Sequence, residues 1–448
     1  MNSVQRGTKT RGGSQKPSCA TRWPRTPHPQ SCASRPSQPE PFLRPLRFPV
    51  WARDPLKFGR SPLMRMKQEI GYGMSENQTI PPDEATGVVI ACSAPGCEPL
   101  YVHERAAITA VARAIADLKG FAFQDGFSNS GGNGACSYFV PDDCLVAAHA
   151  DQLGIKGPRD LFGGVVPWRF ATTKALTHEL VDASAEQPAG WPHGFGRAVN
   201  AAVLPGYSAF SRRDAIQAAE RLLKFGAVRL KPPLSSRGQD QHVVRTVAEV
   251  ASFLEQYRSS DMQECGLVLE ADLHDITTLS IGVATIDEIA VAYYGTQRMT
   301  TDNAGEPVYG GSDLVAMRGE WEAFEALHLP SELRLAVAQA RAYDAAMRSC
   351  PGFFASRRNY DVGQGIDSSG TWRSGVLEAG WRIGGGSTAE LAAMNAMKRD
   401  AGLQTVRVSA VKAFGETARP PANADLHFQG YDPEEGLITR YTVVTQAA

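Results

Sequence analysis

The sequence predicts a mixed α/β protein, of the α/β (α+β) class, in which strands and helices form several layers. From Thr86 onward, short apolar runs alternate with segments whose apolar residues have helical spacing. A β-rich alternation follows from Leu279 to Tyr294. Hydrophobic residues make up 43% of the 448 residues and charged residues 21%. This composition is typical of a globular protein and excludes fibrous and coiled-coil classes.

The N-terminal segment, residues 1–75, differs from the rest of the chain. It contains 11 of the 29 prolines, interleaved with Arg and Ser, so that no helical or strand period survives. We therefore expect a disordered basic segment. Its acid-poor composition is also typical of a transit peptide, and Met64, Met66 and Met74 are alternative starts if the start of the chain is assigned too far upstream.

The charge distribution bears on the partners of the protein. Residues 1–70 carry 14 basic and 3 acidic side chains, whereas the remaining residues carry 32 basic and 44 acidic ones. A body with a net charge of −12 repels polyanions, so we expect no nucleic-acid partner. Asp287 and Glu288 interrupt the longest apolar stretch before it reaches the ~20 residues of a membrane span. We expect no membrane segment either.

The cysteines indicate the cellular setting. The chain has eight of them and no C-x-x-C pair, which favours a reduced, cytoplasmic environment. Cys92 and Cys97 are either a metal or redox pair or structural thiols. A second cluster of His or Cys, which a metal site usually needs, does not lie near them in the sequence, so structural thiols are favoured.

The first predicted domain covers residues 86–165. A strand is expected over Gly87–Cys92 and a helix over Ala106–Leu118, where the apolar spacing is helical. Further short strands are expected over Gly120–Gln124 and Asp143–Ala147, the latter with a helical continuation ending at Gly154. This alternation is typical of a small βα layer domain.

The second predicted unit covers residues 166–262. Ser211 with Asp214, and Thr246 with Glu249, have the spacing of a capping box, in which the hydroxyl caps a backbone N–H and the acid reaches back. A helix is therefore expected to begin after each hydroxyl residue. Between the two helices, Gly226–Lys231 alternates like a strand.

The third predicted unit covers residues 263–445. We expect strands over Gly266–Glu270, near Tyr360 and over Gly375–Glu378. One long helix is expected from Ser331 to about Met347. A final helix is expected to begin at a capping box formed by Ser387 and Glu390.

A first chemical candidate is Lys231, which precedes a loop of small residues. A lysine on a strand before a Ser- and Gly-containing turn can neutralise phosphate charge while backbone N–H groups bind phosphate oxygens. The pattern is neither a Walker A motif nor G-x-G-x-x-G, because the order of Gly and Lys differs. The alternative is an ordinary strand-end lysine beside a turn. Glu270 closes a later apolar strand, where a carboxylate and exposed backbone groups can bind an adenine edge.

A second candidate is a set of oxygen-bearing residues on two strands. Asn359 and Asp361 alternate onto one face of a strand, and Glu378 ends the next strand. Such side chains are the hard oxygen ligands that Mg²⁺ prefers, or alternatively solvated strand-end residues. A zinc site and a serine hydrolase have no support, because His/Cys clusters and a complete G-x-S-x-G motif are absent from the sequence.

Taken in this order, the motifs resemble those of the ATP-grasp superfamily, most nearly the biotin-carboxylase-like branch with its uncharacterised bacterial members. The resemblance covers about Thr86 to Val444. It implies a small pre-ATP-grasp βα domain (86–165), followed by a two-lobed ATP-grasp fold. One lobe (166–262) would contain the phosphate loop, and the other (263–445) the adenine hinge and the metal site.

The resemblance also implies roles for the nucleotide-binding residues. Lys174 and Lys231 look like the two lysines that contact phosphate. The predicted phosphate loop is Ser235, Ser236, Arg237 and Gly238, which has fewer glycines than the family pattern. The predicted adenine hinge is Glu270, Ala271 and Leu273.

On the metal side, Asp361 and Glu378 look like the metal-bridging acids. The family pattern has Asn two residues after the second acid and Arg two residues later again, whereas here Gly380 and Arg382 stand in those places. Arg382 matches, and Asn359 or another oxygen would have to replace the missing ligand. Arg382 and the helix that follows the glycines at 384–386 form either an anion pocket or a flexible turn that leads into the helix.

The function implied is that of a ligase-like enzyme dependent on ATP and Mg²⁺. It would activate a carboxylate, or bicarbonate, as an acyl phosphate for attack by a nucleophile, for which an amine is expected, with Lys231 and Arg382 as catalytic residues. The partners would be ATP and a small-molecule substrate. The alternative is a non-catalytic nucleotide-binding or scaffold protein with a decayed site. Tyr293–Gln297 and Tyr309–Asp313 either shape a substrate pocket or form hairpin turns.

Overall fold

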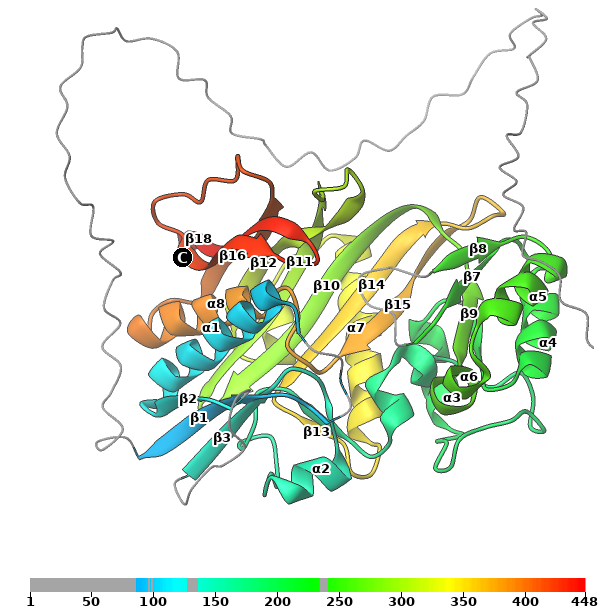
Figure 1. Cartoon of the computed structure of the whole chain (residues 1–448), viewed down its shortest axis with the longest axis horizontal. Coiled ribbons are helices and arrows are strands. Elements are labelled where there is room, and N and C mark those ends of the chain that lie inside the picture. The colour runs from blue at the N-terminus through cyan, green and yellow to red at the C-terminus, as the bar shows by residue number, and fades with distance from the viewer. Residues whose placement is uncertain (1–85, 96, 98–99, 127–135, 234–240, 448) are drawn as a thin grey trace, which may run out of the picture. The chain divides into compact units, whose positions relative to one another are not determined.

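The computed structural model describes residues 86–95, 97, 100–126, 136–233 and 241–447. All of them belong to one compact unit, Gly73–Ala448. The predicted disordered segment 1–75 lies outside the described residues, as does the predicted phosphate loop of Ser235, Ser236, Arg237 and Gly238. The described part is a mixed α/β structure with four sheets, which confirms the predicted fold class (Figure 1).

The N-terminal sheet is parallel and has the order β2-β1-β3. Its elements are β1 (Gly87–Cys92), α1 (Val102–Lys119), β2 (Ala122–Asp125) and β3 (Cys136–Pro141). The expected strand and helix are confirmed, although α1 begins four residues earlier than the apolar spacing indicates. Apolar residues of α1 at helical spacing, among them Ile108, Val111 and Ile115, are buried. The helix ends at Gly120, whose φ of 68° lies in the left-handed region that favours glycine.

A second small sheet has the order β13-β5-β4. Its elements, with the helix that follows the first strand, are β4 (Leu145–Val146), α2 (Ala147–Gln152), β5 (Gly164–Val166) and β13 (Phe354–Ala355). The predicted strand over Asp143–Ala147 is shortened to β4, and its helical continuation is α2. Because β13 comes from a distant part of the chain, this sheet ties the N-terminal region to the C-terminal one.

The third sheet is antiparallel and has the order β6-β9-β7-β8. Its strands and helices are β6 (Gly206–Ala209), α4 (Arg212–Leu222), β7 (Val228–Lys231), β8 (His242–Val244), α5 (Val247–Gln256), α6 (Ser259–Cys265) and β9 (Leu267–Ala271). β9 lies between β6 and β7, so the predicted boundary at 262–263 falls inside this sheet. Short helices connect it to β5, namely η1 (Arg169–Thr172), η2 (Lys174–Thr177), α3 (Phe195–Val199) and η3 (Asn200–Ala202).

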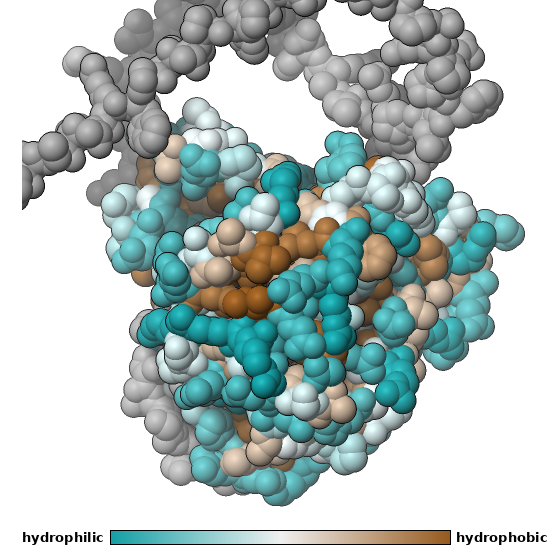
Figure 2. Space-filling view, turned by 90° about the vertical axis from the view of Figure 1, so that its right-hand side faces the viewer, coloured by the Kyte–Doolittle hydropathy of each residue, from teal (hydrophilic) through white to brown (hydrophobic). Residues whose placement is uncertain are grey.

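Two helix caps in this lobe confirm the hydroxyl half of the predicted capping boxes, whereas the acids bind other backbone groups, the N–H of Glu186 for Asp214 and the N–H of Arg245 for Glu249. Ser211 Oγ accepts a hydrogen bond from the N–H of Asp214 at 3.2 Å, and Thr246 Oγ1 accepts one from the N–H of Glu249 at 3.2 Å. Each bond satisfies an N–H of the first helical turn. The face that carries α4 and α5 shows apolar residues gathered among hydrophilic ones (Figure 2).

The largest sheet is antiparallel, with the order β15-β14-β10-β11-β12-β16-β18-β17. Its strands are β10 (His274–Ile286), β11 (Ile289–Thr301), β12 (Pro307–Arg318), β14 (Arg357–Ile366), β15 (Trp372–Gly380), β16 (Thr405–Phe414), β17 (Asp425–Asp432) and β18 (Gly436–Ala447). The helices of this region are η4 (Trp321–Phe324), α7 (Ser331–Arg348) and α8 (Ser387–Arg399). The predicted long helix is therefore confirmed as α7.

The two faces of this sheet are covered by different helices (Figure 1). Ala284, Val291 and Ala316 share one face and pack with α8 and α1, which lie side by side. Val283 and Val362 point to the other face and pack with α7. This alternation follows from the period of two in a strand. Among the described residues, no helix is long and apolar enough to span a membrane.

The predicted capping box at the start of α8 is wrong. The N-cap position is Gly386, and Ser387 Oγ accepts a hydrogen bond from the N–H of Gly384 at 3.0 Å instead. Glu390 does not reach back to the helix start, because its carboxylate is bound by the buried guanidinium of Arg357. A long-range ion pair thus replaces the local interaction that the spacing predicted.

Candidate functional site

The candidate site is a cavity of about 1070 Å³. One wall is the face of the large sheet that α8 and α1 cover elsewhere. Along that face the side chains change from the apolar Ala284 to the polar Ser280, and in the neighbouring strands to Gln297 and Asp361. Other parts of the lining come from β7 and β9, the end of β15 and the starts of α1 and α8. The polar stretch of the sheet is therefore the wall against which a ligand would lie.

At one end of the cavity, Lys231 of β7 pairs with Glu270 of the neighbouring strand β9. The Lys231 Nζ is 2.8 Å from Glu270 Oε1, and it also donates to the carbonyl of Leu377 at 3.1 Å. His178 Nε2 lies 3.4 Å from the other oxygen, Glu270 Oε2. Burial alone would raise the pKa of Glu270, but the positive charge of Lys231 and the contact with His178 lower it to about 2. Glu270 is therefore a carboxylate and Lys231 is held beside the cavity by it.

Lys174, at the start of η2, forms a second lysine–carboxylate pair. Its Nζ lies 2.8 Å from Glu378 Oε2, and the Lys174 residue is 4% exposed. Burial would raise the pKa of Glu378, yet the charges of Lys174, Arg382 and Lys231 lower it. Glu378 lines the cavity, so Lys174 adjoins the cavity through this carboxylate.

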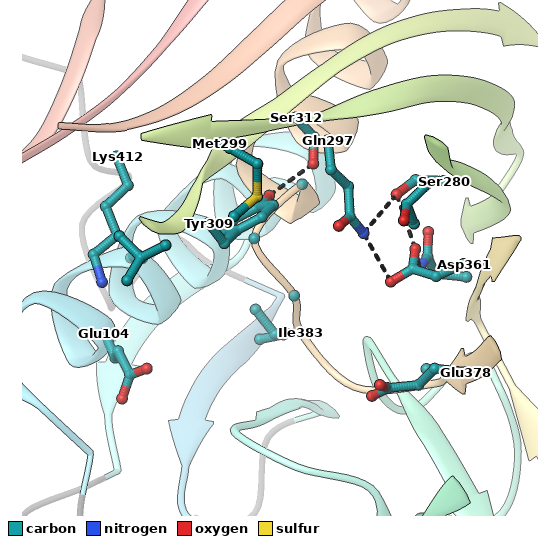
Figure 3. A pocket seen from close by; sticks show the side chains of 18 of the residues that line it. Glu104, Ser280, Gln297, Met299, Tyr309, Ser312, Asp361, Glu378, Ile383 and Lys412 are labelled. Atoms are coloured by element: carbon teal, nitrogen blue, oxygen red, sulfur yellow. Dashed lines mark hydrogen bonds between the residues drawn. The ribbon is translucent and has the colours of Figure 1, made fainter. Parts of the chain in front are cut away.

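Asp361 stands opposite Glu378 across the β14–β15 pair. Its carboxylate accepts hydrogen bonds from Ser280 Oγ at 2.9 Å, from Gln297 Nε2 at 2.9 Å and from Asn359 Nδ2 at 3.1 Å (Figure 3). Burial and the negative charge of Glu378 nevertheless raise the pKa of Asp361. Two carboxylates that repel each other at a cavity wall form a place where a bound cation is favoured.

A β-bulge shapes this part of the site. The pairing is Asp361 with Glu378 and then Val362 with Val376, so Leu377 is the extra residue of β15. The displaced Leu377 carbonyl is the one that accepts a hydrogen bond from Lys231. Gly380 is the register partner of Asn359, and a Cβ placed on Gly380 would meet nothing within 4 Å. The position at which the family pattern has Asn is therefore open space.

Arg382 follows the end of β15. Its Nε lies 3.8 Å from Asp143 Oδ1, which belongs to the connection between β3 and β4. Its backbone carbonyl accepts a hydrogen bond from Arg357 Nη1. The glycines at 384–386 line the cavity next to Arg382 and lead into α8. Tyr309 packs against them, since a Cβ on Gly385 would lie 2.3 Å from the Tyr309 hydroxyl.

The structure thus brings most of the predicted site residues to one cavity. The lining includes Lys231, Glu270, Ala271, Leu273, Asn359, Asp361, Glu378 and Arg382. Lys174 contacts the lining residue Glu378, whereas the predicted phosphate loop lies outside the described residues. The N–H of Ala271 donates to the carbonyl of Pro205 at 2.8 Å. The assignment of these residues to adenine, phosphate and metal remains a prediction.

Sequence reasoning missed several lining residues. Ser280 and Arg357 were not singled out, although polar residues at every second position of a β-rich stretch are a usable signal for a polar sheet face. The stretches Tyr293–Gln297 and Tyr309–Asp313 lie within β11 and β12, so the hairpin-turn alternative is wrong. Tyr293, Gln297 and Tyr309 line the cavity.

The opposite end of the cavity carries a second group of charged residues. Lys412 of β16 pairs with Glu435, and the buried His103 lies 2.9 Å, measured from Nδ1, from Asp432 Oδ2. Glu104 of α1 faces the same space as Lys412, on the far side of Tyr309 and Ile383 from Glu378 (Figure 3). The cavity therefore has two polar ends joined by a partly apolar middle.

The other candidates from the sequence are less prominent. Cys92 and Cys97 are free. Burial raises the pKa of the Cys92 thiol to about 12, and partial desolvation with the negative charge of Asp143 raises that of the exposed Cys97 to about 12, so both thiols are expected to be unreactive. Within the parts of the chain that the structure describes, no group of three or more His, Cys, Asp or Glu is arranged to hold a metal ion.

Comparisons with known proteins give three kinds of result. The chain is similar to carboxyaminoimidazole ribonucleotide synthase from Aspergillus clavatus, solved with ATP (11% identity, TM-score 0.44, covering 80% of this chain and 94% of that one). It is similar to biotin carboxylase from Campylobacter jejuni, at 12% identity and a TM-score of 0.42, covering 81% of this chain and 88% of that one. It is also similar to D-alanine–D-alanine ligase from Bacillus anthracis, at 11% identity and a TM-score of 0.41, covering 70% of this chain and 93% of that one.

At TM-scores below 0.5, these likenesses assign no activity to the chain. Among curated proteins, none matches it. A family described as "Protein of unknown function (DUF3182)" matches residues 95–442. This match covers most of the sequence, and the chain therefore belongs to that family.

Proposed function

We propose that this protein is an ATP- and Mg²⁺-dependent ligase-like enzyme of the ATP-grasp kind, which activates a carboxylate or bicarbonate as an acyl phosphate. The observation that carries the proposal is the arrangement of Lys174 and Lys231. These two buried lysines come from separate segments: Lys231 lines the cavity and pairs with Glu270, and Lys174 pairs with the lining residue Glu378. Buried ammonium groups beside a cavity supply fixed positive charge for the phosphates of a nucleotide.

The reaction proposed has two steps. A carboxylate oxygen of the substrate bonds to the terminal phosphorus of ATP while the bond from that phosphorus to the bridging oxygen of ADP breaks. The lone pair of an amine then attacks the acyl carbon, inorganic phosphate leaves, and the amine loses a proton. Catalysis would consist mainly of positioning and charge stabilisation, with Lys231 and Arg382 facing the charge that develops.

The nucleotide would occupy the end of the cavity between β9 and β15. Ala271 and Leu273 line this end with Glu270 and would contact the adenine, while Lys174 and Lys231 would contact phosphates. Because Lys231 and His178 already occupy both oxygens of Glu270, its carboxylate would act on the nucleotide by holding Lys231. Arg382 and the adjoining glycines would bind the carboxylate or acyl phosphate.

The residues present fit a magnesium ion. Mg²⁺ is usually bound through one or two carboxylates together with substrate phosphates and water. Asp361 and Glu378 supply two carboxylates on the cavity lining, and Asn359 would supply its amide oxygen only after its side chain turns, because that oxygen accepts a hydrogen bond from the Tyr293 hydroxyl at 3.0 Å. The repulsion that raises the pKa of Asp361 would be relieved by the ion. When bound, Mg²⁺ would offset the negative charge of the phosphates.

One observation favours a second function, that of a nucleotide-binding protein without catalysis. Gly380 leaves open space where the family pattern has a metal ligand, and the described residues offer only a two-acid site. A weakened metal site would still permit nucleotide binding through the lysines. Binding and turnover must therefore be measured separately.

The test begins with the thermal stability of the full chain with and without Mg²⁺-ATP. A ligand at a hundredfold its Kd adds about 2.7 kcal/mol to the stability. We expect Tm to rise for the wild type and for Lys156→Ala, which removes an exposed lysine outside the cavity. We expect little change for Lys231→Ala and Glu378→Ala. Absence of a shift in the folded wild type would contradict the proposal.

The second part of the test distinguishes an enzyme from a scaffold. Hydroxylamine converts an acyl phosphate into a hydroxamate, so ATP, Mg²⁺, hydroxylamine and a panel of carboxylates are incubated with the protein. Formation of ADP together with a hydroxamate supports the enzyme. Nucleotide binding without ADP formation over the whole panel, bicarbonate included, supports the non-catalytic function.

A further inference from the structure

Arg357 of β14 makes hydrogen bonds to two other segments beside the site. Its residue is 3% exposed. Nε and Nη2 each lie 2.7 Å from one oxygen of Glu390, which is a two-pronged pair, and Glu390 belongs to α8. Nη1 donates to the carbonyl of Gly380 at 3.4 Å and to the carbonyl of Arg382. One guanidinium therefore joins β14, the end of β15 and α8.

These contacts hold the segment that carries the proposed catalytic and metal residues. Glu378 lies two residues before Gly380, and Arg382 lies two residues after it. The glycine turn passes over the same guanidinium, because a Cβ on Gly384 would lie 3.4 Å from Arg357 Nη2. The backbone of residues 380–386 is therefore fixed at both ends by Arg357 and its partner.

Stability alone is a poor explanation for such a pair. Two charges removed from water lose hydration, and a buried ion pair is often no more stabilising than apolar side chains of similar volume. The planar guanidinium instead offers five N–H donors in a fixed geometry, which a lysine does not reproduce. Arg357 uses that geometry to bind a carboxylate and two carbonyls at once.

We propose that Arg357, together with Glu390, is a positioning residue that fixes residues 378–386, so that Glu378 and Arg382 face the cavity correctly for Mg²⁺-ATP. This inference rests on the proposed function for its consequence in nucleotide binding. Arg357 acts through the backbone carbonyls and through α8. Mg²⁺ is expected to lower the Kd of ATP only when Glu378 lies in the right place relative to Asp361. The Arg357–Glu390 pair therefore determines how much Mg²⁺ tightens the binding of ATP.

The chain provides a matched control in the neighbouring residue. Arg358 is also buried, at 7% exposure, and also pairs with acids, its Nε lying 3.0 Å from Asp344 Oδ1. It points to the opposite face of the sheet, away from the cavity lining. Arg358→Lys therefore changes a buried arginine of the same strand whose acidic partners, Asp344 and Glu320, lie outside residues 378–386. Asp344 reaches this segment only indirectly, through the hydroxyl of Tyr360 and the indole of Trp381.

The experiment compares the full-length wild type with Arg357→Lys, Glu390→Gln, the double variant and Arg358→Lys. The Kd of ATP is measured by calorimetry with Mg²⁺ and with EDTA. We expect both single variants at the Arg357–Glu390 pair to reduce the Mg²⁺-dependent gain in affinity at least tenfold. The double variant is expected to lose no more than the worse single variant, because the two residues act as one unit. Arg358→Lys is expected to keep the gain.

Amide hydrogen exchange of residues 378–386 provides a readout that does not depend on ATP. We expect it to become at least tenfold faster in Arg357→Lys and Glu390→Gln, and to stay unchanged in Arg358→Lys. Equal effects of Arg357→Lys and Arg358→Lys, or normal exchange in Arg357→Lys, would overturn the inference. If Glu390→Gln keeps the gain while Arg357→Lys loses it, Arg357 contacts the ligand directly and the positioning role is wrong. If the wild type does not bind Mg²⁺-ATP while exchange changes as expected, the proposed function fails and the anchoring of the segment stands.

Discussion

Replacement of Glu270 by Gln tests whether the buried Lys231–Glu270 pair is as strong as its geometry indicates. Gln has nearly the same shape as Glu, so the variant removes a charge without opening a cavity. The ammonium of Lys231 then stays buried, 3% exposed, without the carboxylate that lies 2.8 Å from it. We expect the free energy of unfolding to fall.

The size of the loss follows from the pKa of Glu270. Folding lowers that pKa from 4.5 to about 2 against the opposing effect of burial. A difference of one pKa unit corresponds to about 1.4 kcal/mol, so the charged form is stabilised by about 3 kcal/mol. This agrees with the roughly 3–5 kcal/mol lost when one partner of a buried ion pair is removed.

The dependence on pH has a definite sign. Because the pKa is lowered in the folded state, the carboxylate contributes its full stability above pH 4.5 and loses it as the pH falls toward 2. Urea unfolding at pH 7, 6, 4 and 3 should show a constant gap between wild type and Glu270→Gln at the two higher values and a narrowing gap below. Glu255→Gln, an exposed acid on α5, serves as the control. A gap under about 0.5 kcal/mol at pH 7, or one that does not narrow, would refute the reasoning.

Three further predictions follow from local geometry. Gly380→Asn should be tolerated, because its Cβ meets nothing within 4 Å, and should tighten Mg²⁺-dependent ATP binding in calorimetry; unchanged affinity would mean that the natural site lacks no ligand. Ser211→Ala removes the cap of α4 and should cost about 1 kcal/mol in urea unfolding. Gly385→Ala would place a Cβ 2.3 Å from the Tyr309 hydroxyl and 2.5 Å from ring atom Cε1, and should cost about 1–3 kcal/mol in urea unfolding. Because the ring atoms remain, Tyr309→Phe should not restore the stability, and Gly430→Ala, where the nearest atom is 3.6 Å away, should have little effect.

Local patterns predicted most elements of the fold but little of their arrangement. The helical spacing of apolar residues is visible in α7, and the hydroxyl–acid spacing located the starts of α4 and α5. The insertion of β9 between β6 and β7 has no local signal, because it depends on pairing between strands far apart in the chain. The pairing of β13 with β5 across about 190 residues is invisible for the same reason.

In the candidate site, too, local motifs were predicted and long-range contacts were not. Lys231 and Glu270 were singled out separately, each as a ligand contact, because their motifs are local. Their ion pair became apparent only when β7 and β9 were found to be neighbours. Arg357 and Glu390 were missed or misassigned, since Glu390 has the spacing of a cap and its true partner lies 33 residues away. Sequence patterns therefore identify functional polar residues more readily than they identify the side chains to which those residues are bonded.

The arrangement of charges explains why nucleotide and metal should bind together. Lys174, Lys231 and Arg382 contribute three positive charges at the site, and Glu270, Glu378 and Asp361 contribute up to three negative ones. A triphosphate alone would add several negative charges to this near-neutral set and would lie against the Asp361–Glu378 pair. A divalent ion bound with it would offset part of that charge at the place where the two carboxylates repel each other. If the proposed function is correct, these six side chains predict weak binding of ATP in EDTA and strong binding with Mg²⁺.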